Sequence, residues 1–63
     1  MPKYYVKKYR EEAGLTQAEL AARSGVSRGI IIRLESGDLI ETTTGTLIAI
    51  ADALGKKVSE IFY

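Results

Sequence analysis

The residues that could do chemistry in this sequence are charged ones, because it contains nine lysines and arginines, eight acidic residues, no histidine and no cysteine. Disulfides, thiolate chemistry, the usual zinc sites and a histidine general base are therefore excluded. An enzyme would need carboxylates and lysines that converge in a pocket, and a chain of 63 residues leaves little room for one. We therefore expect a binding protein rather than an enzyme, with no metal and no other cofactor.

The basic and acidic residues are unevenly divided between the two halves of the chain. Residues 1–33 carry seven basic and three acidic residues, a balance of +4, whereas residues 34–63 carry two basic and five acidic residues, a balance of −3. Such asymmetry is typical of a protein that turns one side toward nucleic acid. A solvated surface with scattered charges would give the same counts, so the composition leaves both interpretations open.

The stretch GVSRGIIIRLESG, residues 25–37, joins two of these basic residues to three consecutive isoleucines. β-Branched residues favour strands, but no other segment of the chain supplies a convincing partner strand. Ser27 is a good helix N-cap, and Ser36 followed by Gly37 is typical of a helix end. We therefore predict a helix from about residue 27 to residue 36.

This predicted helix has two unlike sides when its residues are placed at about 100° per residue. Ile31 and Leu34 lie on one side, with Ile30 and Ser27 beside them, and this side is expected to pack against the protein. The opposite side carries Arg28, Gly29, Ile32, Arg33 and Ser36. One isoleucine is thus expected between two arginines on the outer surface.

A second helix is expected on the other side of Gly25. Thr16 and Glu19 form the S/T-x-x-E pattern of a capping box, in which each side chain binds a backbone amide at a helix start. Gly25 adopts a positive φ more easily than other residues and ends this helix. Two short helices joined by a tight glycine turn are typical of a helix-turn-helix unit, here at about residues 16–36, whose outer helix is free to enter a DNA major groove.

Three further helices are expected around this unit. They are residues 3–13, which Gly14 ends, a helix from residue 43 or 44 to Gly55, and a last turn through Phe62 that Ser59 caps. The sequence therefore predicts an all-α protein, a compact bundle of about five short helices in a single domain over residues 1–63. Its core is expected to contain Val6, Tyr9, Leu15, Leu20, Val26, Ile31, Leu34, Leu47, Ile50, Ala51, Leu54, Val58, Ile61 and Phe62.

No segment has the composition of a membrane anchor or a secretion signal. The longest apolar stretches are far short of the ~18 residues that span a bilayer. The N-terminal stretch PKYYVKKYR is basic but lacks the apolar region of a secretory signal. We therefore expect a cytoplasmic protein without a membrane-spanning helix.

These elements together resemble a known family. LTQAELAARSGVSRGIIIRLESG, followed by TLIAIADALGKKVSEIF, is similar to the phage Cro/repressor-type helix-turn-helix regulators of the XRE-like family. The resemblance extends from about residue 6 to residue 62. It rests on four blocks in a fixed order: T-Q-x-E-L-A, G-V-S, a hydrophobic pair ending in L-E-x-G, and T-L-x-x-I-A-x-A-L-G. It implies a lambda-repressor-like DNA-binding domain that acts as a transcriptional regulator.

The resemblance also implies a site for double-stranded DNA. Gln17 matches a position that touches a phosphate or a base edge, and Ser27 and Arg28 match contacts at the start of the recognition helix. Arg28 is suited to bind guanine with two hydrogen bonds. The remaining expected contacts are Gly29, Ile32 and Arg33 on the same helix and Thr42, Thr43 and Thr44 before the fourth helix. Arg10 and Glu35 match a structural ion pair and are assigned to the scaffold.

Two of these positions depart from the family pattern, which usually has polar residues there. Gly29, in mid-helix, costs about 0.5–1 kcal/mol relative to alanine, and it either lets the backbone approach DNA or has no contact to make. Ile32 is suited to apolar contact with a thymine methyl group. A protein contact and a tolerated exposed apolar residue are the other interpretations of Ile32.

Two functions stay open. In the first, the protein regulates transcription as a homodimer on a palindromic operator, because one domain of this size supplies too few contacts for high affinity. Residues 58–63 are the first candidate for the dimer contact, and residues 39–40 are the second. The alternative is a protein-binding module of the same fold, antitoxin-like or an anti-repressor partner, which the net charge of only +1, Ile32 and the stretch DLIE at residues 38–41 favour.

Overall fold

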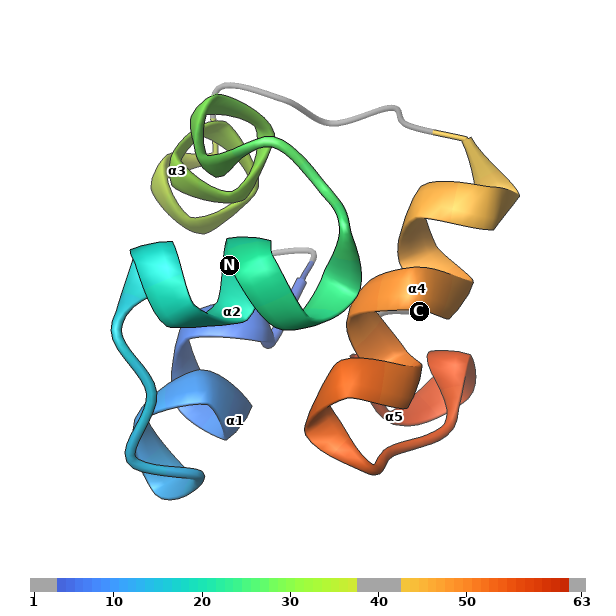
Figure 1. The fold of residues 1–63 in the computed structure, drawn as a ribbon. Coiled ribbons are helices and arrows are strands. Elements are labelled where there is room, and N and C mark those ends of the chain that lie inside the picture. The colour runs from blue at the N-terminus through green and yellow to red at the C-terminus, as the bar shows by residue number, and fades with distance from the viewer. Residues whose placement is uncertain (1–3, 38–42, 62–63) are drawn as a thin grey trace.

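Five helices make up the part of the chain that the computed structural model describes, residues 4–37 and 43–61, and no extended strand occurs there. They are α1 (Val6–Glu12), α2 (Gln17–Ser24), α3 (Arg28–Ser36), α4 (Thr44–Leu54) and α5 (Val58–Ile61). The predicted all-α bundle of five short helices is thereby confirmed. Figure 1 shows α3 above α2, with α1 and α5 on the lower side of the molecule.

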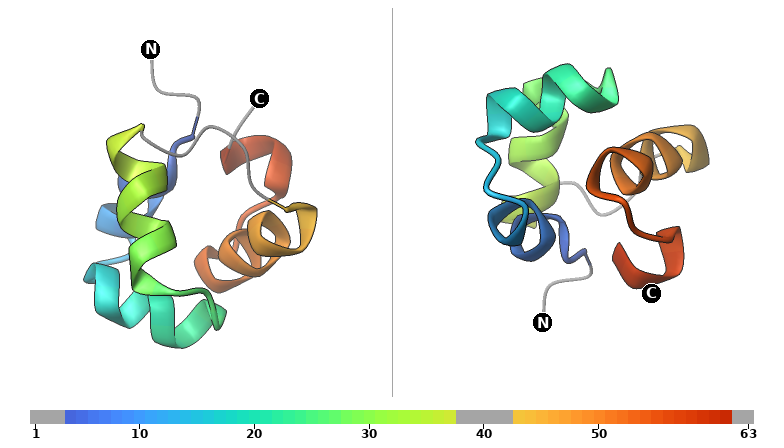
Figure 2. Two further views of the ribbon diagram at one scale, coloured as in Figure 1. Left: turned by 90° about the horizontal axis from the view of Figure 1, so that it is seen from above. Right: turned by 60° about the horizontal axis from the view of Figure 1, so that its bottom comes forward.

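The helices form two groups around one core. Both views in Figure 2 show α1, α2 and α3 on one side and α4 with α5 on the other. Helix α2 packs against both α3 and α4 and so joins the two groups. The buried residues between them include Val6, Leu15, Leu20, Ile31, Leu34, Leu47, Ile50, Ala51 and Ile61. Within the described ranges, no helix is long and apolar enough to cross a membrane.

The ends of α2 and α3 follow from their capping residues, as the sequence predicts. Thr16 Oγ1 accepts a hydrogen bond from the Glu19 amide at 3.0 Å, and Glu19 Oε1 accepts one from the Thr16 amide at 2.8 Å, so both halves of the capping box are present. Ser27 Oγ accepts from the Ile30 amide at 3.3 Å at the start of α3. Gly25 ends α2 with a φ of +73°, a conformation that favours glycine.

The predicted start of the first helix is wrong. Helix α1 begins at Val6, about three residues later than the sequence indicates. Tyr4 is buried instead of helical, and the Tyr5 amide donates a hydrogen bond to the Ile61 carbonyl. The backbone before α1 is therefore held by α5, which comes last in the chain, and the local sequence carries no sign of that contact.

Two further expectations about helix positions are also wrong. Ser59 does not cap the last helix, because it is the second residue of α5, and the Glu60 carboxylate accepts a hydrogen bond from the Lys57 amide at 3.0 Å at this helix start. Gly29 is the second residue of α3 and not a mid-helix residue. The expected core position of Phe62 lies outside the described residues.

Candidate nucleic-acid interface

The inner and outer sides of α3 differ as the helical spacing predicts. Ile31 is fully buried and Leu34 is 2% exposed, whereas Ile32, between them in the chain, is 41% exposed. Arg28, Gly29 and Arg33 are exposed on the same outer side. The predicted inward positions of Ile31 and Leu34 and the outward position of Ile32 are therefore confirmed, whereas Ser27, expected beside the buried residues, is exposed.

Among the described residues, neither arginine of α3 is paired with an acidic side chain. Arg28 is the first residue of the helix and Arg33 is the sixth. Each guanidinium can donate five hydrogen bonds in a planar fork, which matches phosphate oxygens and the major-groove edge of guanine. The outer side of α3 can therefore bind an anionic, acceptor-rich surface.

The serine and threonine residues expected at the interface begin helices. Ser27 and Thr43 are the exposed N-caps of α3 and α4, and each side-chain oxygen accepts a hydrogen bond from a backbone amide. Thr44 is the exposed first residue of α4, and Thr42 lies outside the described residues. The Ser27 hydroxyl, which accepts from the helix, can still donate its own hydrogen to an outside acceptor, whereas Thr43 Oγ1 also shares a hydrogen bond of 2.8 Å with Thr46 Oγ1. Figure 1 shows α3 and the N-terminal end of α4 on the same, upper side of the molecule.

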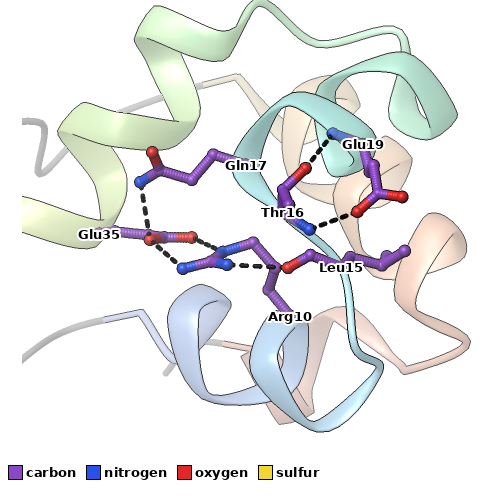
Figure 3. A network of polar contacts seen from close by, with 6 residues as sticks. All are labelled: Arg10, Leu15, Thr16, Gln17, Glu19 and Glu35. Atoms are coloured by element: carbon purple, nitrogen blue, oxygen red, sulfur yellow. Dashed lines mark hydrogen bonds and ion pairs between the residues drawn. The ribbon is translucent and has the colours of Figure 1, made fainter.

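A network of hydrogen bonds joins α3 to α1 and to the loop before α2. Arg10 Nε and Nη2 donate to the two carboxylate oxygens of Glu35, at 2.7 and 3.1 Å, and Arg10 Nη1 donates to the Leu15 carbonyl at 2.8 Å. Figure 3 shows these contacts between α1, the loop before α2, and the last turn of α3. The two charged side chains are only 11% and 5% exposed. The hydrogen bond to Glu35 raises the pKa of Arg10 above its ordinary value and so favours its charged form.

Gln17 belongs to the same network. Its Nε2 donates to Glu35 Oε1 at 3.0 Å, and its amide oxygen points away from that carboxylate in Figure 3. The sequence assigns Gln17 to DNA and Glu35 to the scaffold, and the structure brings the two together. No pattern in the sequence indicates this link, because the two residues are eighteen positions apart on different helices.

A basic hollow lies between α1, the start of α2 and α3. Its volume is about 590 Å³, and its lining residues are Lys7, Arg10, Thr16, Gln17, Ala18, Arg28 and Glu35. Lys7 was not among the residues predicted for this region. Lys7 comes three residues before Arg10 and so shares its side of α1, a spacing that could have indicated the position.

Two further lysines contact an aromatic ring of the scaffold. The ammonium groups of Lys8 and Lys56 lie 5.3 and 5.0 Å from the centroid of the Tyr9 ring. Such cation–π contacts are favourable and here join α1 to the turn before α5.

Known proteins with similar sequences were found. Residues 6–61 match the model of the helix-turn-helix family. The chain is 43% identical over 60 residues to an "Uncharacterized HTH-type transcriptional regulator" of Methanothermobacter thermautotrophicus, a match that covers 90% of this chain and 83% of that protein. It is 54% identical over 39 residues to "Putative antitoxin HigA3" of Mycobacterium tuberculosis, a match that covers 62% of this chain and only 36% of that protein.

Proposed function

Because the chain belongs to the helix-turn-helix family, as its resemblance to Cro/repressor-type regulators indicated, we propose that it is a sequence-specific DNA-binding transcriptional regulator. In this proposal α3 lies in the major groove as the recognition helix. The observation that carries it is the outer side of α3, where Arg28 and Arg33 are exposed without an ion pair among the described residues. Such arginines favour a ligand that brings acceptors and negative charge.

The residues of α3 take distinct parts in this proposal. Arg28, at the helix start, binds guanine through O6 and N7, the bidentate contact that its fork matches. Arg33 binds a phosphate or a second base, and Ser27 donates its hydroxyl hydrogen to a phosphate oxygen while its oxygen caps the helix. Gln17, held by Glu35, borders the same hollow as Arg28 and contacts the backbone at the groove edge.

A second contact is proposed at the start of α4. Thr43 and Thr44 are exposed at a helix N-terminus, where the helix dipole favours a phosphate. These contacts position the protein without reading sequence. Thr42, the further contact expected here, lies outside the described residues.

The proposed regulator acts as a homodimer on a palindromic operator. One small domain buries too little surface for a specific complex, so two copies on half-sites about 34 Å apart are expected. Within α5, Ile61 is buried and Val58 packs on the core, which leaves Ser59 and Glu60 as the exposed part of this helix for a second copy. Residues 39–40 and 62–63, the other dimer candidates, lie outside the described residues.

The proposal is tested by selecting bound sequences from a random duplex pool at low salt. Wild-type protein should enrich a palindromic motif, and its affinity for that motif should fall steeply as salt rises. Arg28→Ala should lose the preference for guanine at one position of each half-site, at a cost of about 1–3 kcal/mol. Arg23→Ala is the matched control, because Arg23 is an exposed arginine at the far end of α2. Failure of the wild-type protein to enrich any motif would refute the proposal.

A second candidate function is a protein-binding module, and the match to a protein named as an antitoxin favours it. In that case the exposed Ile32 would contact a partner protein instead of DNA. A pull-down with Arg28→Ala/Arg33→Ala distinguishes the two functions. A stoichiometric partner that the double variant retains, together with no enriched DNA motif, would favour the second function.

A further inference from the structure

We propose that Ile32 reads the methyl group of a thymine that lies about two base pairs from the guanine bound by Arg28. This inference rests on the proposed DNA-binding function and adds one base and its position to it. In this proposal Ile32, which the core does not bury, helps to determine which DNA sequence the protein binds.

The first observation is the exposure of Ile32. Of the three consecutive isoleucines, Ile31 is fully buried and Ile30 packs partly against the core, but Ile32 remains 41% exposed. It lies on the outer side of α3 between two exposed arginines. An apolar side chain gains binding energy only where the ligand offers apolar surface, and in the major groove the C5-methyl group of thymine is the apolar group that a base pair displays.

The second observation concerns Gly29, which lies three residues before Ile32 on the same side of the helix. Four other glycines, at positions 14, 25, 37 and 55, have φ values between +69° and +87°, a conformation that other residues rarely adopt. Gly29 is not among the positive-φ residues, and a Cβ there would come no closer than 3.6 Å to Ser27 Oγ, an ordinary contact. Neither the backbone nor the packing of the protein requires glycine here.

The missing side chain at Gly29 matters for the approach of α3 to DNA. The isoleucine side chain is short, so it reaches a base edge only if the axis of α3 comes close to the groove floor. A side chain at position 29 would stand beside Ile32 and hold the helix away. Gly29 therefore lets α3 approach DNA, and Ile32 is the side chain that benefits from the approach.

The spacing along α3 sets the position of the thymine. Ile32 is four residues after Arg28, which corresponds to about 6 Å along the helix axis. Base pairs stack about 3.4 Å apart, so the two side chains reach bases about two steps from one another. The half-site is thus expected to combine a guanine at the Arg28 position with a thymine two steps away.

The test replaces thymine by deoxyuridine, which removes only the methyl group. In the operator obtained from the selection, each thymine is replaced in turn and dissociation constants are measured. Wild-type protein should bind about fourfold more weakly when one particular thymine of a half-site is replaced, the effect of burying one methyl group. Ile32→Ala should bind the thymine and uracil forms equally. Ile48→Ala is the matched control, since Ile48 is 45% exposed on α4, and it should keep the fourfold difference.

Gly29→Ala supplies an independent test of the close approach. The added methyl group should weaken binding and reduce the difference between the thymine and uracil operators, because Ile32 no longer reaches the thymine methyl group, while circular dichroism melting shows a fold at least as stable as wild type. The inference is overturned if no thymine position responds to uracil, if Ile32→Ala keeps the response, or if the responding thymine lies away from the guanine. Absence of any enriched motif would instead refute the proposed function, and this inference with it.

Discussion

The two sides of α3 differ in their contacts with the rest of the protein. On the inner side, Ile31 and Leu34 are buried and Glu35 accepts hydrogen bonds from two other helices. On the outer side, Arg28 and Arg33 have no ion pair among the described residues, and Ile32 is exposed. The inner contacts fix where the helix lies, and the outer residues determine what it can bind. We therefore expect stability and DNA recognition to be altered separately by substitutions on the two sides.

The largest expected difference is in the loss of folding stability when each of two neighbouring isoleucines is replaced by alanine. Ile31→Ala should lower the free energy of unfolding by about 2–5 kcal/mol, because it removes fully buried methyl groups and leaves a cavity. Ile32→Ala should change it by no more than about 0.5 kcal/mol, because Ile32 is 41% exposed and lies outside the core cluster. Urea denaturation of both variants measures the two values. Equal losses would show that the outer side of α3 also contributes to the core.

Removing the ion pair between Arg10 and Glu35 should give the next largest loss of folding stability. Glu35→Gln removes the charge that pairs with Arg10 and leaves a guanidinium that is only 11% exposed without its carboxylate. We expect the free energy of unfolding to fall by about 2–3 kcal/mol. Glu12→Gln, an exposed position at the end of α1, is the control and should have little effect in the same urea titration. A Glu35→Gln variant as stable as the control would mean that burial of Ile31 and Leu34 alone holds the helix.

Replacing two glycines of the helix-turn-helix unit by alanine should change folding stability in opposite directions. Gly25 has a φ of +73°, and Gly25→Ala should therefore cost about 1–2 kcal/mol. Gly29 lies in the first turn of α3 with an ordinary φ and room for a methyl group, so Gly29→Ala should be neutral or should stabilise the fold by up to about 0.5 kcal/mol. Thermal melting followed by circular dichroism measures both. A destabilised Gly29→Ala variant would point to a structural need for this glycine and weaken its assignment to close approach.

Local signals in the sequence predicted most of the helix boundaries. The capping box at Thr16 and Glu19 and the glycine after α2 act within a few residues, so they can be recognised without the fold. The start of α1 could not be predicted, because the Tyr5 amide is bound by a carbonyl at the other end of the chain. Likewise, the two-sided character of α3 follows from its own spacing, whereas the hydrogen bond between Gln17 and Glu35 depends on how two helices pack.

The smallest effect is expected at the capping box of α2, and it depends on pH. The hydrogen bond from the Thr16 backbone amide, as the main cause, and the Thr16 side chain, as the second, lower the pKa of Glu19 below its ordinary value of ~4.3. The unfolded chain therefore binds a proton at this carboxylate more readily than the folded protein does. The stabilisation is fully present above the unfolded pKa and is lost as the pH falls through the folded pKa. Melting temperatures of the wild type and Glu19→Gln should thus differ most near pH 7 and converge as the pH approaches 3, because the variant cannot titrate at this position. A difference that stayed constant over this range would mean that charge at Glu19 does not contribute to the start of α2.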